Sequence, residues 1–427
     1  MNFKCGERTY DIDLSNWNNH KHLTAAATNP ISEEEAIQTA LNHPYGSKRL
    51  SACVKPNETV CIVVSDITRA YQRMWVYLPF LVQELEAAGL PDQNIFFLSA
   101  NGTHRAQSEA EHRKLLGDLY DRFEITDHCG NDLTSVKTVG TTQYGNEIKL
   151  NRKALAADHI ILTGAVLFHD LAGFGGGRKS LLPGIAATEC IQRNHRLALV
   201  GDEGEIHPEV GSGKMEKNPL NREMQEVADW IKPTFILNVA IGGDGKISKA
   251  FAGHYRAAHE AGQDFVCQQD GQWIDKKADL VIGSAGGYPK DINLYQSTKA
   301  VSNLIGGVRP GGTLLLFADC QEGFGYHEMS DILLDPCPLP QLAKKVADRF
   351  SVARYIGYWT RKVAKEIEIV LVSSLPSDQL EAVGIKTFLD ADSALQYIQA
   401  KTEIHSLLTV PKAGQIYVQC KGEQDHD

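Results

Sequence analysis

Short apolar runs rich in β-branched residues alternate with stretches of helical periodicity along most of this chain, and this alternation constrains its fold more than any other feature. Strands that alternate with helices form parallel sheets whose two faces are covered by helices. The first series predicts strands over residues 60–65, 95–98 and 159–166, and helices over residues 75–88 and 108–116. Residues 237–247 predict a hairpin with Asp244-Gly245 near its turn.

A second series of strands and helices begins at Leu280. It predicts strands over residues 280–284, 314–317, 369–372 and 416–418, and a helix over residues 295–304. With 427 residues the chain exceeds the size at which one hydrophobic core stops growing, so we expect two domains. A polar helical stretch over residues 254–277 is expected to join them. We therefore predict an α/β protein of two α/β domains with mostly parallel sheets, divided into residues 1–270 and 271–427.

The composition limits the class of protein and its partners. A hydrophobic content of 43% with 22% charged residues is typical of a soluble globular protein, and no apolar run is long enough to cross a membrane. The first residues lack the apolar segment of a secretory signal, and nine scattered cysteines without a C-x-x-C pair favour reduced thiols. The net charge of -10 argues against nucleic acid as a non-specific partner, but leaves room for a local basic pocket. We expect a cytoplasmic protein with no nucleic-acid or membrane partner.

A glycine-rich segment between residues 164 and 196 carries the densest chemistry. His169, Lys179 and His195 stand around a run of glycines that follows a predicted strand and precedes helix-like sequence. A glycine backbone approaches a ligand closely, a lysine amine can form a covalent link, and histidine serves as proton acceptor or metal ligand. A Walker A loop is disfavoured because Arg178 stands where that motif requires glycine, and the glycines are too bunched for a dinucleotide fingerprint. A phosphate bound by the backbone N–H groups of this loop stays open.

Polar loops follow four of the predicted strands. They are residues 66–69 (D-I-T-R), residues 101–105 (N-G-T-H-R), the segment from His169, and residues 286–291 (G-G-Y-P-K-D), which run into Tyr295-Gln296-Ser297-Thr298-Lys299. Because ligands of open α/β sheets bind at the carboxyl ends of the strands, we expect the site there. Plainer interpretations stay open: Asp66 as a helix N-cap, Arg69 and Arg105 as surface charges, and His104 and His195 as structural histidines.

At these blocks the chain resembles the nickel-dependent lactate racemase family. The resemblance covers residues 66–69, residues 102–105, the stretch from His169 to His195, and residues 286–300, in the order that the family has them. It implies two α/β domains with the active site in the cleft between them. It also implies a nickel-pincer nucleotide as cofactor, a Ni(II) pyridinium-3-thioamide-5-thiocarboxylic acid mononucleotide.

The resemblance also assigns roles to individual residues. It implies Lys179 as the covalent attachment point of the cofactor, His195 as the nickel ligand, and His104 and His169 as the two catalytic acid/base groups. Arg69 and Lys299 match the pair that binds the substrate carboxylate. Further cofactor contacts are implied for Asp66, Gly175, Gly176 and Gly177, and further substrate contacts for Tyr295, Gln296 and Trp359.

The chemistry of a 2-hydroxy acid agrees with this set. The C2–H is a very weak acid beside a carboxylate, so a histidine near neutral pH cannot remove it as a proton at a useful rate. Its removal as hydride, while the hydroxyl proton leaves to a base, is easier. We predict a 2-hydroxy acid racemase with lactate as the default substrate, and the enzymes that make the cofactor as its protein partners. Alternatives are a racemase or epimerase of malate, an aryl-lactate or a sugar acid, a non-catalytic cofactor carrier, and a nucleotide-dependent phosphotransferase, which Arg178 disfavours.

Overall fold

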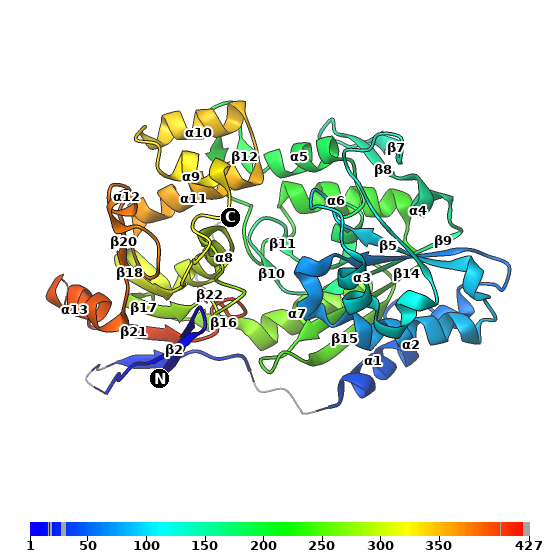
Figure 1. The fold of residues 1–427 in the computed structure, drawn as a ribbon, viewed down its shortest axis with the longest axis horizontal. Helices are drawn as coiled ribbons and strands as arrows, with labels where there is room; N and C mark the ends of the chain where they lie inside the picture. The colour runs from blue at the N-terminus through cyan, green and yellow to red at the C-terminus, as the bar shows by residue number, and fades with distance from the viewer. Residues whose placement is uncertain (16, 18, 27–30, 402, 422–427) are drawn as a thin grey trace. The chain divides into compact units, whose positions relative to one another are not determined.

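The structure of the protein is a computed structural model that describes residues 1–15, 17, 19–26, 31–401 and 403–421. The chain forms two compact units, whose elements are labelled in Figure 1. Unit 1 comprises Met1–Ala26, Ala198–Pro208 and Gln269–Asp427, and unit 2 comprises Ala27–Leu197 and Glu209–Gln268. The predicted division at residue 270 differs from these units in two places, because residues 1–26 and 198–208 belong to unit 1.

Unit 2 is built on a six-stranded sheet in the order β15-β14-β9-β4-β5-β6. Its strands are β4 (Val60–Ser65), β5 (Ile95–Ala100), β6 (Glu124–Asp127), β9 (His159–Ala165), β14 (Phe235–Ile241) and β15 (Ile247–Gly253). Adjacent strands are parallel except β15, which pairs antiparallel with β14 as the sequence predicts. Residues 60–64 of β4 are fully buried because both faces of the sheet are covered.

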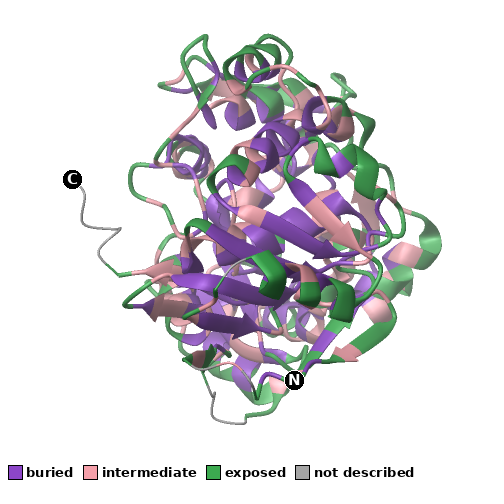
Figure 2. Cartoon of the chain, turned by 90° about the vertical axis from the view of Figure 1, so that its left-hand side faces the viewer, coloured by how far each residue is buried: buried purple, intermediate pink, exposed green. Residues whose placement is uncertain are grey.

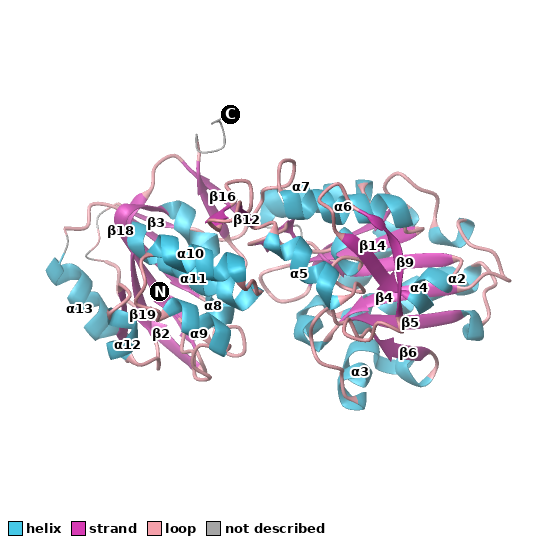
Figure 3. Ribbon diagram, turned by 90° about the horizontal axis from the view of Figure 1, so that it is seen from above, coloured by secondary structure: helices cyan, strands magenta, loops and turns pink. Residues whose placement is uncertain are grey.

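Helices flank this sheet, as Figure 3 shows in cyan. They are α1 (Glu33–Asn42), α2 (Met74–Ala87), α3 (Glu109–Leu116), α4 (Arg152–Ala156), α5 (Thr188–Arg196), α6 (Pro219–Ile231) and α7 (Ala257–Asp270). Local sequence fixes where they begin: Ser108 and Glu111 form a capping box at the start of α3, and Asn218 caps α6. Two short antiparallel pairs complete the unit, β7 (Val136–Thr141) with β8 (Glu147–Asn151) and β10 (Phe168–His169) with β11 (Gly173–Phe174).

Unit 1 has a second six-stranded sheet in the order β20-β19-β18-β17-β21-β3, parallel throughout. Its strands are β3 (His20–His22), β17 (Ala278–Ser284), β18 (Val308–Phe317), β19 (Glu368–Val372), β20 (Ile385–Phe388) and β21 (Leu407–Val410). Figure 2 shows the strands of this sheet largely in the colour of buried residues. The α/β class with mostly parallel sheets, predicted from the alternating sequence pattern, is present in both units.

The helices of unit 1 follow its strands in sequence. They are α8 (Leu294–Leu304), α9 (His327–Leu333), α10 (Leu339–Asp348), α11 (Val352–Glu366), α12 (Ser377–Glu381) and α13 (Ala391–Lys401). Hydrophobic residues on one side of α10 and α11 are buried, as expected for helices that cover a sheet. Within the ranges that the structure describes, no helix combines the length and the apolar character needed to span a bilayer.

Two sequence predictions are wrong in detail. The stretch over residues 254–277 is helical only as far as α7, because Gly271–Ile274 forms the strand β16. The predicted strand over residues 416–418 is β22 (Tyr417–Cys420), which pairs with β16 outside the large sheet. The place in the sheet beside β17 is taken by β21, which the sequence analysis did not identify.

A hairpin from the start of the chain covers part of the carboxyl edge of the unit 1 sheet. It consists of β1 (Asn2–Cys5) and β2 (Arg8–Asp11). The backbone N–H of Gly6 donates to Asp291 Oδ2 at 2.7 Å, and the Ser284 hydroxyl donates to Lys4 O. Gly6 has φ +56 and an added Cβ would lie 2.5 Å from Asp319 Oδ2, so this turn requires glycine. Its contacts leave Asp291 only 1% exposed.

Candidate active site

Three of the predicted polar loops meet at the carboxyl edge of the unit 2 sheet. β5, β4 and β9 are parallel neighbours, so the loops that follow them leave from the same edge. The loop after β5 contacts the segment beyond the glycine run, since the N–H of Gly102 donates to Gly184 O at 2.9 Å. An added Cβ at Gly102 would lie 3.6 Å from Pro183 O, in ordinary van der Waals contact.

The first pair of site residues is Asp66 with His104. His104 Nδ1 lies 2.6 Å from Asp66 Oδ2, and the side chain of Asp66 is 6% exposed whereas that of His104 is 42% exposed. The other carboxylate oxygen accepts from the N–H of Thr68 at 2.8 Å and from the Thr68 hydroxyl. Asp66 is therefore both the N-cap of the 3-10 helix η2 (Ile67–Gln72) and the partner of His104.

The protonation state of Asp66 decides which nitrogen of His104 carries the proton. Burial alone raises the pKa of the Asp66 carboxyl, but the hydrogen bonds and charge of His104, together with the Thr68 hydroxyl, outweigh burial and hold the pKa below its usual range. An ionised Asp66 accepts the Nδ1–H of the ring, which leaves Nε2 as the atom that exchanges a proton with a ligand. A histidine held by a carboxylate in this way has the geometry of a general base with its orienting group.

Gln107 supports this loop and was not identified from the sequence. Its Oε1 accepts from the N–H of Ile67 at 2.6 Å, and its Nε2 donates to Ser99 Oγ at 2.7 Å. It thereby ties the loop that carries His104 to the one that carries Asp66. The other charged residue of the segment, Arg105, pairs with Glu111 at 2.6 Å on the surface, so its plainer interpretation as a surface charge is confirmed.

The second pair is His169 with Lys179. His169 lies on the short strand β10, whose partner β11 brings it opposite Gly173. His169 Nε2 lies 2.6 Å from Lys179 Nζ, and Nδ1 lies 3.1 Å from Asp170 Oδ1. The N–H groups of Leu171 and Ala172 also point at Nδ1, at 3.2 and 3.3 Å. Lys179 itself lies in the 3-10 helix η5 (Gly177–Ser180) directly after the glycine run.

The glycine run is explained by contacts within the protein. An added Cβ would lie 2.7 Å from Asn238 Oδ1 at Gly176 and 2.8 Å from the His259 ring at Gly177, and would clash with Lys214 O at Gly173. The N–H groups of Gly175 and Gly177 donate to Leu167 O at 2.8 Å and to Asn238 Oδ1 at 2.9 Å. Those two donors therefore hold the loop together, and the role of Gly175, Gly176 and Gly177 in cofactor binding stays a prediction.

Arg178 anchors the loop from inside. Its guanidinium is 1% exposed and donates to Ala172 O at 2.9 Å, Phe174 O at 3.3 Å and Asn221 Oδ1 at 2.8 Å. Burial lowers its pKa to about 9. His259, beside it, donates to Gly175 O at 2.8 Å, and burial together with the charge of Arg178 lowers the pKa of that histidine to about 3. Arg178 is therefore turned away from the position that a phosphate-binding residue would need.

His195 lies on α5 with its ring orientation fixed. Nδ1 donates to Ile191 O at 2.8 Å, one turn earlier, so Nε2 carries the lone pair. Burial, with a smaller contribution from the charge of Lys179, lowers the pKa of His195 to about 4, and the ring is neutral at pH 7. A neutral imidazole held by a backbone carbonyl is the usual form of a metal-binding histidine. In the described part of the chain, no group of three or more His, Cys, Asp or Glu side chains is placed to hold a metal.

The remaining predicted residues belong to unit 1. Tyr295, Gln296 and Lys299 lie on α8, where Lys299 Nζ donates to Gln296 Oε1 at 2.6 Å. The Tyr295 ring packs edge-on against Tyr326, with 4.7 Å between the ring centroids. Trp359 is half-buried on α11, a helix that packs against α8. The structure thus joins Asp66 to His104 and His169 to Lys179 in one unit, and Gln296 to Lys299 in the other.

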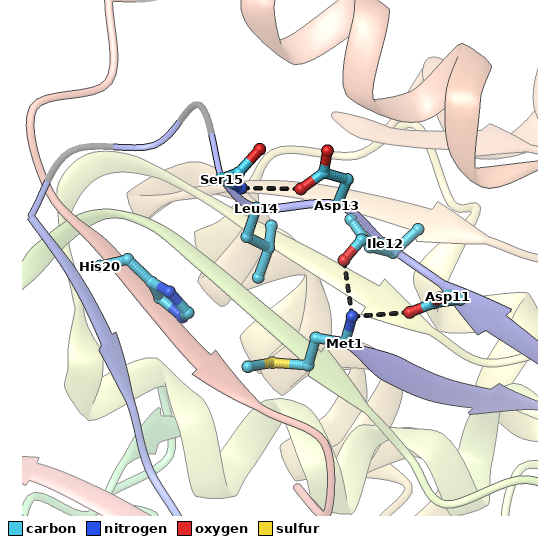
Figure 4. Close-up of a pocket in the computed structure, with 7 residues that line it drawn as sticks. All are labelled: Met1, Asp11, Ile12, Asp13, Leu14, Ser15 and His20. Atoms are coloured by element: carbon cyan, nitrogen blue, oxygen red, sulfur yellow. Dashed lines mark hydrogen bonds and ion pairs between the residues drawn. The ribbon is translucent and has the colours of Figure 1, made fainter.

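A pocket at the start of the chain is distinct from these residues. It is lined by Met1, Asp11, Ile12, Asp13, Leu14, Ser15 and His20, which are drawn in Figure 4. The amino group of Met1 donates to Asp11 Oδ1 and to Ile12 O, both at 2.7 Å. None of the predicted site residues is among those that line it.

Comparison with known proteins decides the family. The sequence profile of the lactate racemase N-terminal domain matches residues 5–206, and that of the lactate racemase C-terminal domain matches residues 274–416. The chain belongs to the lactate racemase family. Two curated relatives are the lactate racemase of Thermoanaerobacterium thermosaccharolyticum, 35% identical over 69% of this chain and 68% of the relative, and that of Lactiplantibacillus plantarum, 33% identical over 76% of each.

The solved structures agree with this family assignment. The lactate racemase apoprotein of T. thermosaccharolyticum superposes with a TM-score of 0.87 at 27% identity, covering 98% of this chain and 99% of that one. The prediction of two α/β domains is confirmed by this match. The predictions that the chain is lactate racemase-like and an isomerase of the racemase type are confirmed as well.

Proposed function

We propose that this protein racemises a 2-hydroxy acid, with lactate as substrate and a nickel-pincer nucleotide as cofactor. The observation that carries the proposal is the Asp66–His104 pair, a histidine base oriented by a buried carboxylate, in a chain of the lactate racemase family. A second histidine, His169, lies at the same edge of the sheet with its Nε2 against Lys179. Two histidine bases are what reversible proton exchange from two enantiomers requires.

The residues fit the proposed cofactor. His195 offers one neutral imidazole nitrogen and no protein cluster completes a metal site among the described residues, which suits a metal that brings most of its ligands within a cofactor. Lys179 offers an amine for covalent attachment beside it. When bound, this cofactor supplies the acceptor for the hydride on C2.

The side chains of the protein supply binding and proton transfer. In the proposed reaction His104 Nε2 takes the hydroxyl proton of one enantiomer, and ionised Asp66 stabilises the imidazolium that results. His169 returns a proton to form the other enantiomer, and the roles reverse in the opposite direction. Arg69 and Lys299 bind the substrate carboxylate, with Tyr295, Gln296 and Trp359 beside the substrate.

We propose lactate as the substrate because the relatives are lactate racemases. The size of the 2-hydroxy acid that fits depends on the residues around the substrate. Larger 2-hydroxy acids such as malate, aryl-lactates and sugar acids undergo the same chemistry, so they are the alternatives to lactate. The proposed partners are the small-molecule substrate and the enzymes that make the cofactor. We place the protein in the cytoplasm, since its nine scattered cysteines without a C-x-x-C pair favour reduced thiols.

The test is expression of the protein together with the cofactor-making enzymes, followed by three measurements. Intact mass and nickel content report loading, with Lys179→Ala as the variant that loses the covalent mass. Chiral chromatography then follows the conversion of D-lactate and L-lactate, and of the larger acids, by wild type and His104→Gln. We expect about one nickel per chain and racemisation that His104→Gln abolishes. A loaded protein that converts none of these acids would instead be a cofactor carrier.

A further inference from the structure

Three side chains of unit 2 form a continuous polar chain that ends at an amine. Asp170 Oδ1 lies 3.1 Å from His169 Nδ1, and His169 Nε2 lies 2.6 Å from Lys179 Nζ. Asp170 and His169 are each about one quarter exposed. Two further groups belong to this neighbourhood: the Arg178 guanidinium, which points into the loop interior, and His195, whose pKa is lowered in part by the charge of Lys179.

The ring of His169 has partners at both of its nitrogens. Nδ1 accepts from the N–H groups of Leu171 and Ala172, and Asp170 Oδ1 lies 3.1 Å from it as an ion-pair partner when the ring is doubly protonated. On the other side, Lys179 Nζ donates to Nε2 as an ammonium and accepts from it as an amine. When Nε2 takes a proton from Lys179 the ring becomes an imidazolium, and the Asp170 carboxylate beside Nδ1 stabilises its charge.

We propose that Asp170, His169 and Lys179 form a nucleophile triad, in which His169 removes the proton of Lys179 while the amine attacks an acyl or thioacyl carbon. The logic is that of a nucleophile, a base in hydrogen-bond contact with it, and a third group that orients the base. The inference rests on the proposed function only for the identity of the acyl donor, an activated carboxylic or thiocarboxylic group of the cofactor.

The step balances without a change of oxidation state. A bond forms between Nζ and the acyl carbon, and the bond from that carbon to its leaving group breaks, the leaving group departing with the electron pair. The proton lost by Nζ passes to His169 Nε2 and from there to the leaving group. The triad needs no oxidant or reductant, only a donor with a suitable leaving group.

The same contact means that unmodified Lys179 also blocks His169. As long as its amine or ammonium occupies His169 Nε2, that atom is not available to a substrate hydroxyl. Acylation removes the charge and the basic lone pair of Nζ, and so frees His169 for the proton transfer proposed above. Attachment of the cofactor at Lys179 therefore also makes His169 Nε2 available to accept a proton from the substrate.

The experiment measures the nucleophilicity of Lys179 in the full-length protein without cofactor. Trace acetylation with acetic anhydride at pH 7.5, read by peptide mass spectrometry, gives the rate at Lys179 relative to the exposed Lys232 as an internal reference. We expect Lys179 to react at least about 10-fold faster than Lys232, a modest share of the roughly 10²–10⁴-fold that general-base catalysis contributes. His169→Gln should bring this ratio down by about 10-fold or more, and Asp170→Asn by a smaller factor.

Two controls make the result decisive. The exposed His43→Gln should leave the ratio unchanged, and Asp170→Asn keeps the test valid if His169→Gln does not fold. The inference is overturned if Lys179 of the wild type reacts no faster than Lys232, or if the ratio survives in the folded triad variants. A reactive Lys179 in the cofactor-free protein, together with a loaded protein that racemises nothing, would overturn the proposed function and leave the triad standing. An active racemase with an unreactive Lys179 would do the reverse.

Discussion

The carboxyl edges of the two sheets differ in what covers them. In unit 2 the loops after β4, β5 and β9 present the paired side chains Asp66–His104 and His169–Lys179, whose histidines are partly exposed. In unit 1 the hairpin β1–β2 donates the N–H of Gly6 to Asp291 and accepts the Ser284 hydroxyl. The carboxyl edge of the unit 2 sheet thus presents paired titratable side chains, whereas that of the unit 1 sheet is partly covered by a backbone hairpin.

This difference shows that a polar loop after a parallel strand does not by itself make a site. At the unit 2 edge each carboxylate faces a histidine that can gain or lose a proton. At the unit 1 edge Asp291 faces backbone N–H groups, which fix a turn but exchange no proton with a ligand. Whether a carboxylate at such an edge can take part in proton transfer therefore depends on its hydrogen-bond partner and not on its position after a strand.

The largest expected effect tests the unit 2 edge through activity. Asp66→Asn should lower the racemisation rate by about 100-fold, because the amide no longer stabilises a protonated His104. Stability should change little, since Asn is also a good helix N-cap. Initial rates with each enantiomer measure this, and Thr68→Ala, which removes a hydroxyl partner of Asp66 but not His104, should keep most of the rate. Equal losses in the two variants would refute the pairing as a catalytic unit.

The next effect concerns why the loop is rich in glycine. Gly177→Ala should destabilise the cofactor-free protein by about 2–4 kcal/mol, because Gly177 has φ +57 and the new Cβ meets the His259 ring at 2.8 Å. Gly145→Ala is the matched control, since its φ is +74 but nothing lies within 4 Å of the added Cβ. Urea unfolding measures both. If the two variants lose the same stability, packing against His259 is not the reason for the glycine.

A smaller effect tests the closed edge of unit 1. Asp291→Asn should lower the free energy of unfolding by about 1–2 kcal/mol, because the N–H groups of Gly6 and Asp319 lose a charged acceptor. Racemisation by the folded variant should stay near that of wild type. The exposed Asp13→Asn serves as control for removal of a charge. A variant of unchanged stability that racemises slowly would place Asp291 with the chemistry instead.

The smallest effect is a pH dependence of the free energy of unfolding, caused by the buried histidines of unit 2. The pKa of His195 is lowered to about 4 and that of His259 to about 3, so as pH falls below 6.5, the ordinary pKa of histidine, the unfolded chain binds protons at these positions first. The contribution of these histidines to stability is therefore complete above pH 6.5 and decreases as the pH drops toward their pKa values in the folded protein. Between pH 7 and 6 each histidine should contribute a loss of about 0.7 kcal/mol. His259→Gln should remove that share in urea titrations, and the exposed His43→Gln serves as the matched control for loss of a histidine.

The sequence predicted the elements that carry the site because their signals are local. The strands β4, β5 and β9 are apolar runs bounded by polar loops, and both features lie within a few residues of one another. The histidines His104 and His169 were selected because they follow such strands. Their partners Asp66 and Lys179 were also selected, but the pairing of each with its own histidine required the structure.

What the sequence did not predict depends on contacts between distant residues. Gln107 has no distinctive neighbour in the chain, and its role comes from Ser99 and Ile67 on other segments. The glycines were interpreted as space for a ligand because His259 and Asn238 lie 60 or more residues away in the chain. The closed edge of unit 1 escaped prediction for the same reason, since Gly6 and its partner Asp291 are 285 positions apart.

The pairing of β3 with β21 has a consequence for how the protein is made. His20 lies opposite Leu407, so an outer strand of the unit 1 sheet is synthesised long before the neighbour with which it pairs. At ribosomal speed the first segment waits roughly 20–80 s for that partner. The sheet of unit 2, whose strands all lie between residues 60 and 253, is complete on the emerging chain before then. The sheet of unit 1 therefore closes only after that of unit 2, and a chain cut short before residue 407 lacks the strand that pairs with β3.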